Sequence, residues 1–224
     1  KQKIRKSLGN FVISDPYAAN AKNGVYTVTS LYFDDLNLSS YFEKLAGLKG
    51  RKKFRIRTYE NSIRNNSKVY LEIKRRDEVV IFKDRSLVSF KTVLAGLEEG
   101  FYEKLLEHGE KDVTNQFVAY FLKKFLKPNV LISYRREAYL DSKNYSFRIT
   151  LDQDLSASRS YNISFERSDL LRILPGYAIL EAKFNRIMPA WFGPVIRSFN
   201  LDRTSFSKYC FGLESCGIVP RTDL

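Results

Sequence analysis

Hydrophobic and polar residues alternate with a period of two in many stretches of this chain, which is typical of β-strands with two different faces. β-branched and aromatic residues are frequent in the same stretches, and polar turns separate them. The pattern predicts strands at residues 25–33, 52–59, 68–76, 79–87, 130–140, 145–152, 161–166 and 177–185.

Helical spacing replaces this alternation elsewhere in the chain. Ile4, Leu8, Phe11 and Val12 recur at helical intervals and predict an amphipathic helix over residues 3–13. There is no repeat, low-complexity tract or linker, so residues 1–224 are predicted to form one α+β domain dominated by antiparallel sheet. Further helices are predicted at 37–45, in two or three segments within 90–127, from Pro189 to about residue 199, and from about Ser205 onward.

Arginine and lysine dominate the polar face of the predicted strands. In the strand at residues 52–59, Lys53, Arg55 and Arg57 share one face with Tyr59, and the apolar residues take the other. For any single strand, a solvent-facing surface is the more common explanation of such alternation. The polar faces of the other strands carry Glu72 and Lys74, Lys83 and Arg85, Tyr134 and Arg136, Arg148, Thr150 and Asp152, and Glu181 and Lys183.

Two features favour an enclosed charged face over a solvent-facing one. A solubilising face would mix serine, threonine, glutamate and lysine, whereas this face is mainly cationic. The predicted helices also need an apolar sheet surface to cover, and the alternate residues provide it on every strand. We therefore expect the antiparallel sheet to close into a β-barrel with helices packed outside and a basic lumen, which leaves no exposed sheet edge.

Crowded cations of this kind require a partner. Two like charges about 8 Å apart repel by roughly 2 kcal/mol at an effective dielectric constant of about 20, so the lumen must hold water, counter-ions or an anionic ligand. Neighbouring guanidinium groups suit bidentate binding of oxyanions, which favours a triphosphate or a chain of phosphates. Glu72 and Glu181 lie among the cations, where they either orient them as ion pairs or hold a divalent metal, Mg²⁺ or Mn²⁺.

Composition argues against several other chemistries. The chain has one histidine, His108, and two cysteines, Cys210 and Cys216, too few for a histidine-rich metal site, a zinc site or a convincing Ser/His/Asp triad. No glycine-rich phosphate-binding motif occurs. No apolar run is long enough to cross a bilayer, so we expect no membrane segment in this chain and a cytoplasmic location with reduced thiols.

The net charge of +13 makes nucleic acid a partner to consider. The cations lie within predicted strands rather than in a basic tail or a recognition helix, so no nucleic-acid partner is expected. Lys49, Arg51, Lys52 and Lys53 form the best candidate for a basic patch outside the barrel, although a solvated turn is the more common explanation of such a run.

Seven short motifs occur in an order that is specific to one family, over residues 25–209. They are Ser30-Leu31-Tyr32-Phe33-Asp34, Lys53-Phe54-Arg55-Ile56-Arg57-x-Tyr59, Leu71-Glu72-Ile73-Lys74-Arg75-Arg76, Ser133-Tyr134-Arg135-Arg136-Glu137-Ala138-Tyr139, Arg148-Ile149-Thr150-Leu151-Asp152, Leu180-Glu181-Ala182-Lys183 and Phe206-Ser207-Lys208-Tyr209. Together they resemble the VTC domain, the polyphosphate polymerase domain of the vacuolar transporter chaperone complex and a branch of the CYTH-like triphosphate tunnel metalloenzymes.

The resemblance implies an eight-stranded tunnel in which basic side chains bind the phosphates of a nucleoside triphosphate such as ATP. A metal then assists transfer of the γ-phosphate to polyphosphate. By motif position, the resemblance assigns metal binding to Glu181, phosphate binding to Arg55, Arg57, Lys74, Lys83, Arg136, Arg148, Lys183 and Lys208, and catalysis to Arg55, Arg57, Lys74, Arg136 and Lys208.

The chain departs from the family pattern in one place. The family's first strand carries an acidic-x-acidic-x-Lys motif, and this sequence lacks it, so we expect the first strand to lie upstream of Lys1. Three functions remain open: a metal-dependent polyphosphate polymerase-like enzyme, a triphosphate hydrolase of the same fold, and a non-catalytic module that binds polyphosphate or another anion.

Overall fold

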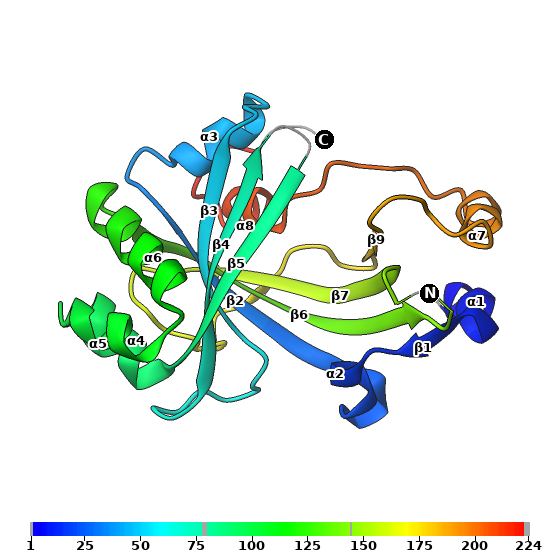
Figure 1. The fold of residues 1–224 in the computed structure, drawn as a ribbon. Coiled ribbons are helices and arrows are strands. Elements are labelled where there is room, and N and C mark those ends of the chain that lie inside the picture. Colours follow the sequence, from blue (N-terminus) through cyan, green and yellow to red (C-terminus); the bar gives the residue numbers. More distant parts are fainter. Residues whose placement is uncertain (1, 78–79, 144, 222–224) are drawn as a thin grey trace. The chain divides into compact units, whose positions relative to one another are not determined.

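The computed structural model describes residues 2–77, 80–143 and 145–221, and Figure 1 shows its helices and strands. The helices are α1 (Gln2–Leu8), α2 (Pro16–Ala19), α3 (Ser39–Leu45), α4 (Phe90–Leu97), α5 (Tyr102–His108), α6 (Lys111–Lys123), α7 (Phe192–Ser198) and α8 (Lys208–Ser215). The strands are β1 (Val12–Ser14), β2 (Tyr26–Asp34), β3 (Arg51–Thr58), β4 (Lys68–Asp77), β5 (Val80–Ser89), β6 (Lys127–Asp141), β7 (Arg148–Arg159), β8 (Leu171–Arg172) and β9 (Ala178–Lys183). None of the helices in the described ranges has the length and apolar character needed to cross a membrane.

The strands form a sheet in the order β5-β4-β3-β2-β6-β7-β8, with β1 beside β6 and β9 beside β7. Antiparallel pairing holds for β1 with β6, β2 with β3, β3 with β4, β4 with β5, β7 with β8, and β7 with β9. The predicted α+β class with a mainly antiparallel sheet is therefore confirmed.

The predicted closure of the sheet into an eight-stranded barrel is wrong. The path of paired strands starts at β5 and ends at β8, and no strand in the described part of the chain pairs with β5 on one side and with β8 or β9 on the other. A barrel has no edges, because its first and last strands are hydrogen-bonded to one another. The described residues form an open sheet because they supply no strand to bridge its two edges.

The chain divides into two compact units. Unit 1 comprises Lys1–Thr27, Tyr134–Leu155 and Leu174–Phe206. Unit 2 comprises Val28–Ser133, Ser156–Ile173 and Ser207–Leu224. Each unit has its own buried apolar cluster, and each is described below by itself. The single domain expected from the sequence stays a prediction.

In unit 2, helices cover one face of the strands β3, β4 and β5, and Figure 1 shows α4, α5 and α6 on the same side of them. The edge of the Phe117 ring on α6 meets the ring of Phe54 on β3, with 5.6 Å between ring centres. The apolar alternates of β3 and β4 are buried under the helices, which confirms the predicted division of faces for these two strands, whereas Phe82 on the same face of β5 is 48% exposed. The shared cluster includes Phe54, Ile56, Leu71, Ile73, Val93, Leu97, Leu105, Phe117 and Val118.

Unit 1 is held together by aromatic packing around β7. Trp191 lies parallel to Phe11, with 4.7 Å between ring centres, and its Nε1 donates a hydrogen bond of 2.7 Å to Oδ2 of Asp141. These contacts tie the segment before α7 to the chain after α1 and to the end of β6. The buried members of the cluster are Leu8, Phe147, Ile149, Phe192 and Val195.

Two predicted elements differ from the structure. The helix predicted at residues 3–13 ends at Leu8, and Val12–Ser14 instead pairs with β6 as a short strand. The segment predicted as a strand at residues 161–166 is a loop, although Ile163 and Phe165 are buried in the core of unit 2. The other predicted strands and helices are present, with shifted ends, and three helices occupy residues 90–123.

Candidate functional site

The charged face of unit 2 is arranged in rows that run across three strands. Arg55 of β3 lies opposite Glu72 of β4, which in turn lies opposite Arg85 of β5. The next row consists of Lys53, Lys74 and Lys83 in the same order. Directly opposed side chains in an antiparallel sheet are close neighbours, so three lysines in one row create a strongly positive strip.

Glu72 is the anionic centre of this face. Its side chain is 1% exposed, and its Oε2 accepts a hydrogen bond of 2.6 Å from Nε of Arg55. Nζ of Lys83 is 2.6 Å from Oε1, and a guanidinium nitrogen of Arg57 is 3.7 Å from Oε2. Because three cations surround one carboxylate, these four residues carry a net positive charge, which attracts an anionic ligand. We call Arg55, Arg57, Glu72 and Lys83 the Glu72 cluster.

The charges of the cluster determine its protonation states. Burial raises the pKa of Glu72, but Arg55, Arg57 and Lys83 outweigh it and lower the pKa to about 2. Burial lowers the pKa of Lys83 to about 8, although Glu72 opposes the change. Glu72 therefore stays ionised at neutral pH and holds the cations in place, which is the ion-pair alternative among the two roles predicted for it.

Two hydroxyl groups on β2 fix the guanidinium groups. Tyr32 accepts a hydrogen bond of 2.9 Å from Arg55, and Oγ of Ser30 accepts one of 3.0 Å from Nε of Arg57. Burial opposes ionisation of Tyr32, but the charges of Arg55 and Arg57 outweigh it and lower the pKa of the phenol to about 8. Tyr32 was not among the predicted site residues, although it lies within the first of the seven motifs.

The ionisation of Tyr32 is open to direct measurement. We expect one of the 14 tyrosines to ionise near pH 8, well below the usual value of about 10, because of Arg55 and Arg57. Ultraviolet difference absorbance of the phenolate should report this step, and Tyr32→Phe should remove it. Arg55→Ala should return it toward higher pH. A titration in which no tyrosine ionises below pH 9 would contradict the assignment.

Lys53 is a second residue of the charged face that the site prediction left out. Its Nζ donates a hydrogen bond of 3.0 Å to Oγ of Ser207, and it lies 3.6 Å from Sγ of Cys210 and 4.9 Å from the ring centre of Tyr209. Burial lowers the pKa of Lys53. Lys53 is two residues before Arg55 in the same strand, so alternation places both on one face, and this pattern could have added Lys53 to the predicted site.

These contacts place the start of α8 on the charged face of unit 2. Ser207 caps the helix by accepting a hydrogen bond from the backbone N of Cys210, and Lys208 is its first residue. The Tyr209 hydroxyl donates a hydrogen bond of 2.5 Å to Asp34, whose carboxylate also accepts from the backbone N–H groups of Ser40 and Tyr41 in α3. The motif that contains Lys208 is thus anchored through a buried carboxylate.

The remaining predicted site residues lie in unit 1. Arg136 makes two hydrogen bonds to Asp152, of 2.6 and 2.8 Å, and its guanidinium is 5.2 Å from the ring centre of Tyr134. The side chain of Arg135 is 57% exposed and contacts Asp154, whereas that of Arg136 is 9% exposed; the choice of Arg136 as the phosphate-binding residue stays a prediction. Burial lowers the pKa of Arg136, but Tyr134 and Asp152 outweigh this effect, so the pKa is raised overall.

A pair of basic residues lies across β7 and β9 in the same unit. Arg148 is in register with Lys183, and it donates a hydrogen bond of 2.5 Å to Asp15. Glu181 is in register with Thr150, and its carboxylate is 3.3 Å from Nζ of Lys183. Arg148, Glu181 and Lys183 therefore lie together on one face of this pair of strands.

The two predicted metal ligands differ in how well they suit a cation. Glu72 does not fit the role, because three cations already surround it. Glu181 is 40% exposed and lies 3.3 Å from Lys183, so its carboxylate is accessible to a metal that takes one carboxylate together with phosphate oxygens and water. Over residues 2–77, 80–143 and 145–221 there is no group of three His, Cys, Asp or Glu side chains suited to holding a metal alone.

Comparison with known proteins agrees with the resemblance predicted from the seven motifs. A family model described as the VTC domain matches residues 1–216. Vacuolar transporter chaperone complex subunit 4 of Schizosaccharomyces pombe is 26% identical over 227 residues, which cover 84% of this chain and 31% of that protein. This chain therefore spans less than a third of the relative's length.

A solved structure supports the fold independently. A putative adenylate cyclase from Bacillus halodurans matches with a TM-score of 0.50 and 13% sequence identity, over 92% of this chain and 88% of that chain. At this level of identity, the match concerns the fold alone.

Proposed function

Because this chain belongs to the VTC domain family, we propose that it binds triphosphates and polyphosphate and transfers the γ-phosphate of ATP to a polyphosphate chain. The observation that carries this proposal is the Glu72 cluster, in which two arginines and a lysine surround a single buried carboxylate. The row of Lys53, Lys74 and Lys83 extends the positive charge along the strands, as a linear polyanion requires.

The chemistry of phosphoryl transfer suits such a cluster. The reaction asks little covalent chemistry of the protein, and its rate depends on positioning and on stabilisation of negative charge around the transferred group. Arg55 and Arg57 are held by Glu72, Tyr32 and Ser30 before any ligand binds. They therefore need little reorganisation to receive phosphate oxygens, and their planar groups favour bidentate contacts.

In this proposal, Lys74 and Lys208 also bind phosphate in unit 2, and Arg136, Arg148 and Lys183 do so in unit 1, as the family resemblance predicts. Glu181 is the protein ligand of a divalent metal, Mn²⁺ or Mg²⁺. When bound, the metal neutralises part of the charge on the phosphates.

The reaction product tests the proposal. Purified full-length protein with Mn²⁺ and ATP is expected to yield ADP and long-chain polyphosphate, whose length gel electrophoresis measures. Arg57→Ala should lower the rate by at least about tenfold, because it removes a charge from the cluster. Orthophosphate as the sole phosphate product would instead indicate a hydrolase, and tripolyphosphate binding without turnover would indicate a binding module.

A further inference from the structure

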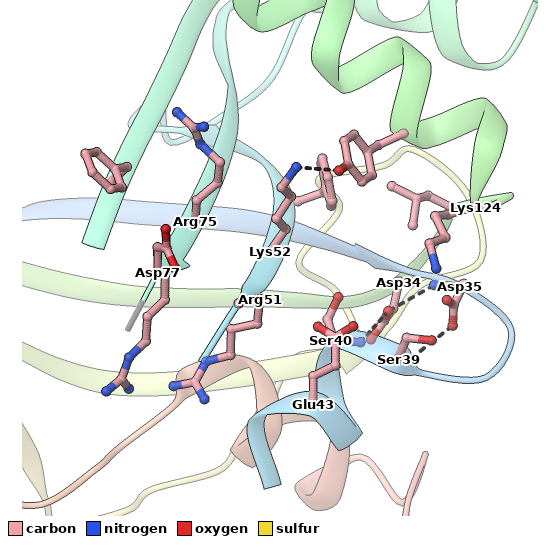
Figure 2. A pocket seen from close by; sticks show the side chains of 16 residues that line it. Asp34, Asp35, Ser39, Ser40, Glu43, Arg51, Lys52, Arg75, Asp77 and Lys124 are labelled. Carbon is pink, nitrogen blue, oxygen red and sulfur yellow. Dashed lines mark hydrogen bonds between the residues drawn. The ribbon is translucent and has the colours of Figure 1, made fainter. Parts of the chain in front are cut away.

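A cavity lies at one end of the strands in unit 2, and Figure 2 shows the side chains that line it. Its volume is about 540 Å³, within the range of roughly 300–1,000 Å³ that is typical of small-molecule sites. Its lining comes from α3 and the loop before it, from the ends of β3 and β4, and from β5 and α6. The side chains of the Glu72 cluster do not line it.

Four cations and one carboxylate, Asp77 of β4, form one wall of this cavity, so its net charge is positive. Arg51 and Lys52 come from β3, and Arg75 and Arg76 come from β4. Arg51 lies directly opposite Arg76, and burial together with the charge of Arg76 lowers the pKa of Arg51. Two opposed guanidinium groups repel each other, so an anion between them would relieve the repulsion.

Carboxylate and hydroxyl groups form the other wall. Asp35, Ser39 and Glu43 come from α3 and the loop before it, and Figure 2 shows them across from Arg51, Lys52 and Arg75. The pKa of Glu43 is raised, first by burial and then by the negative charge of Asp34. This wall accepts hydrogen bonds and repels anions, so a polyanion that filled the whole cavity would meet unfavourable charge.

Aromatic side chains complete the lining. Phe82 of β5 is 48% exposed, and the guanidinium of Arg75 lies 5.6 Å from its ring centre. The Nζ of Lys52 lies over the ring of Tyr120 on α6, and 4.0 Å separates this nitrogen from the ring centre. An exposed phenylalanine beside an arginine offers a flat apolar surface of the kind on which nucleobases stack.

We propose that this cavity is a second binding site and that its ligand is a nucleoside monophosphate. A single phosphate group suits Lys52 and Arg75, which lie opposite each other on β3 and β4, and the ring suits Phe82, which lies opposite Arg75 on the same face. Asp84 holds the guanidinium of Arg75 in place through a hydrogen bond of 2.8 Å from Nε. Ribose hydroxyls and a ring amine are donors that suit Asp35 and Glu43. The site is separate from the triphosphate site under "Proposed function" and does not depend on it.

Calorimetric titration of the full chain with AMP, in the presence of saturating inorganic tripolyphosphate, tests this proposal. We expect AMP to bind with a stoichiometry of about one, because tripolyphosphate occupies the charged face and leaves the cavity available. Glu43→Ala and Arg75→Ala, from opposite walls, should each weaken AMP binding by at least about tenfold, while circular dichroism and cooperative thermal unfolding show that both variants are folded.

Matched substitutions at exposed positions outside the cavity, Glu103→Ala and Arg64→Ala, should leave AMP binding unchanged. Arg55→Ala should also leave it unchanged, because Arg55 belongs to the charged face. The proposal is overturned if AMP gives no binding heat at millimolar concentration, if tripolyphosphate displaces AMP, or if Glu43→Ala and Arg75→Ala bind AMP as the original chain does.

Discussion

Replacement of Glu72 by glutamine is expected to lower the melting temperature by about 6–20 °C. The substitution keeps the shape of a buried side chain but removes the negative charge that Arg55, Arg57 and Lys83 share. Loss of one partner of a buried ion pair costs about 3–5 kcal/mol, and each kcal/mol shifts the melting temperature of a chain of this size by about 2–4 °C. The three cations would be left to repel one another.

Thermal unfolding with and without tripolyphosphate measures this effect. Because the anion replaces the missing negative charge, it should stabilise Glu72→Gln by more degrees than it stabilises the original chain. Glu103→Gln, on the exposed surface of α5, is the matched control and should change stability by no more than about 0.5 kcal/mol. A melting temperature for Glu72→Gln within about 2 °C of the original would contradict the role of Glu72.

The same pair of proteins has a predicted pH dependence. Glu72 has a pKa of about 2 in the folded chain, against about 4.3 for a glutamate in an unfolded chain. Its charge therefore contributes stability that is fully present above about pH 4.3 and is lost as the pH falls toward 2. The stability difference between the original chain and Glu72→Gln should shrink over this range.

The division of strands into a charged and an apolar face was predictable from the sequence, because side chains alternate strictly along a strand. Phe54 and Ile56 pack under the helices, and Arg55 and Arg57 lie on the opposite face with Glu72. Since the two faces have such different chemistry, a register shift of one residue would bury the charges under the helices.

Closure of the sheet was not predictable in this way. Alternation shows which side chains share a face, but it does not show whether an edge strand finds a partner. The loop at residues 161–166 illustrates the same limit. Ile163 and Phe165 are both buried, while the backbone N of Ile163 donates to the side chain of Glu98 rather than to a neighbouring strand. An extended loop with alternate residues in the core has the periodicity of a strand.

The contacts of the site depend on elements that are distant in sequence. Lys53 meets Ser207 and Cys210 of a segment more than 150 residues away, and no local pattern encodes that approach. The segment predicted as a helix over residues 3–13 shows how one apolar spacing can serve two structures. Ile4 and Leu8 pack from α1, and Val12 packs against the same cluster from β1.

Replacement of Arg55 by alanine is expected to remove most of the thermal stabilisation that tripolyphosphate gives. At a ligand concentration of about 100 times Kd, binding stabilises the folded chain by about 2.7 kcal/mol, or roughly 5–11 °C at this chain length. Arg55 supplies a charged donor at the centre of the cluster, with its guanidinium already held by Glu72 and Tyr32. If its loss weakens binding about 100-fold, the remaining shift is only about 1 °C.

Two further variants separate charge from geometry at this position. Arg55→Lys keeps the charge but loses the planar fork, so it should retain only part of the shift, because a lysine cannot make the bidentate contact. Arg64→Ala removes an exposed arginine of the same unit and should retain the full shift. An unchanged shift in Arg55→Ala would place the phosphate site outside the Glu72 cluster. The proposed reaction would then lose its main structural support, because it depends on phosphate binding at this cluster.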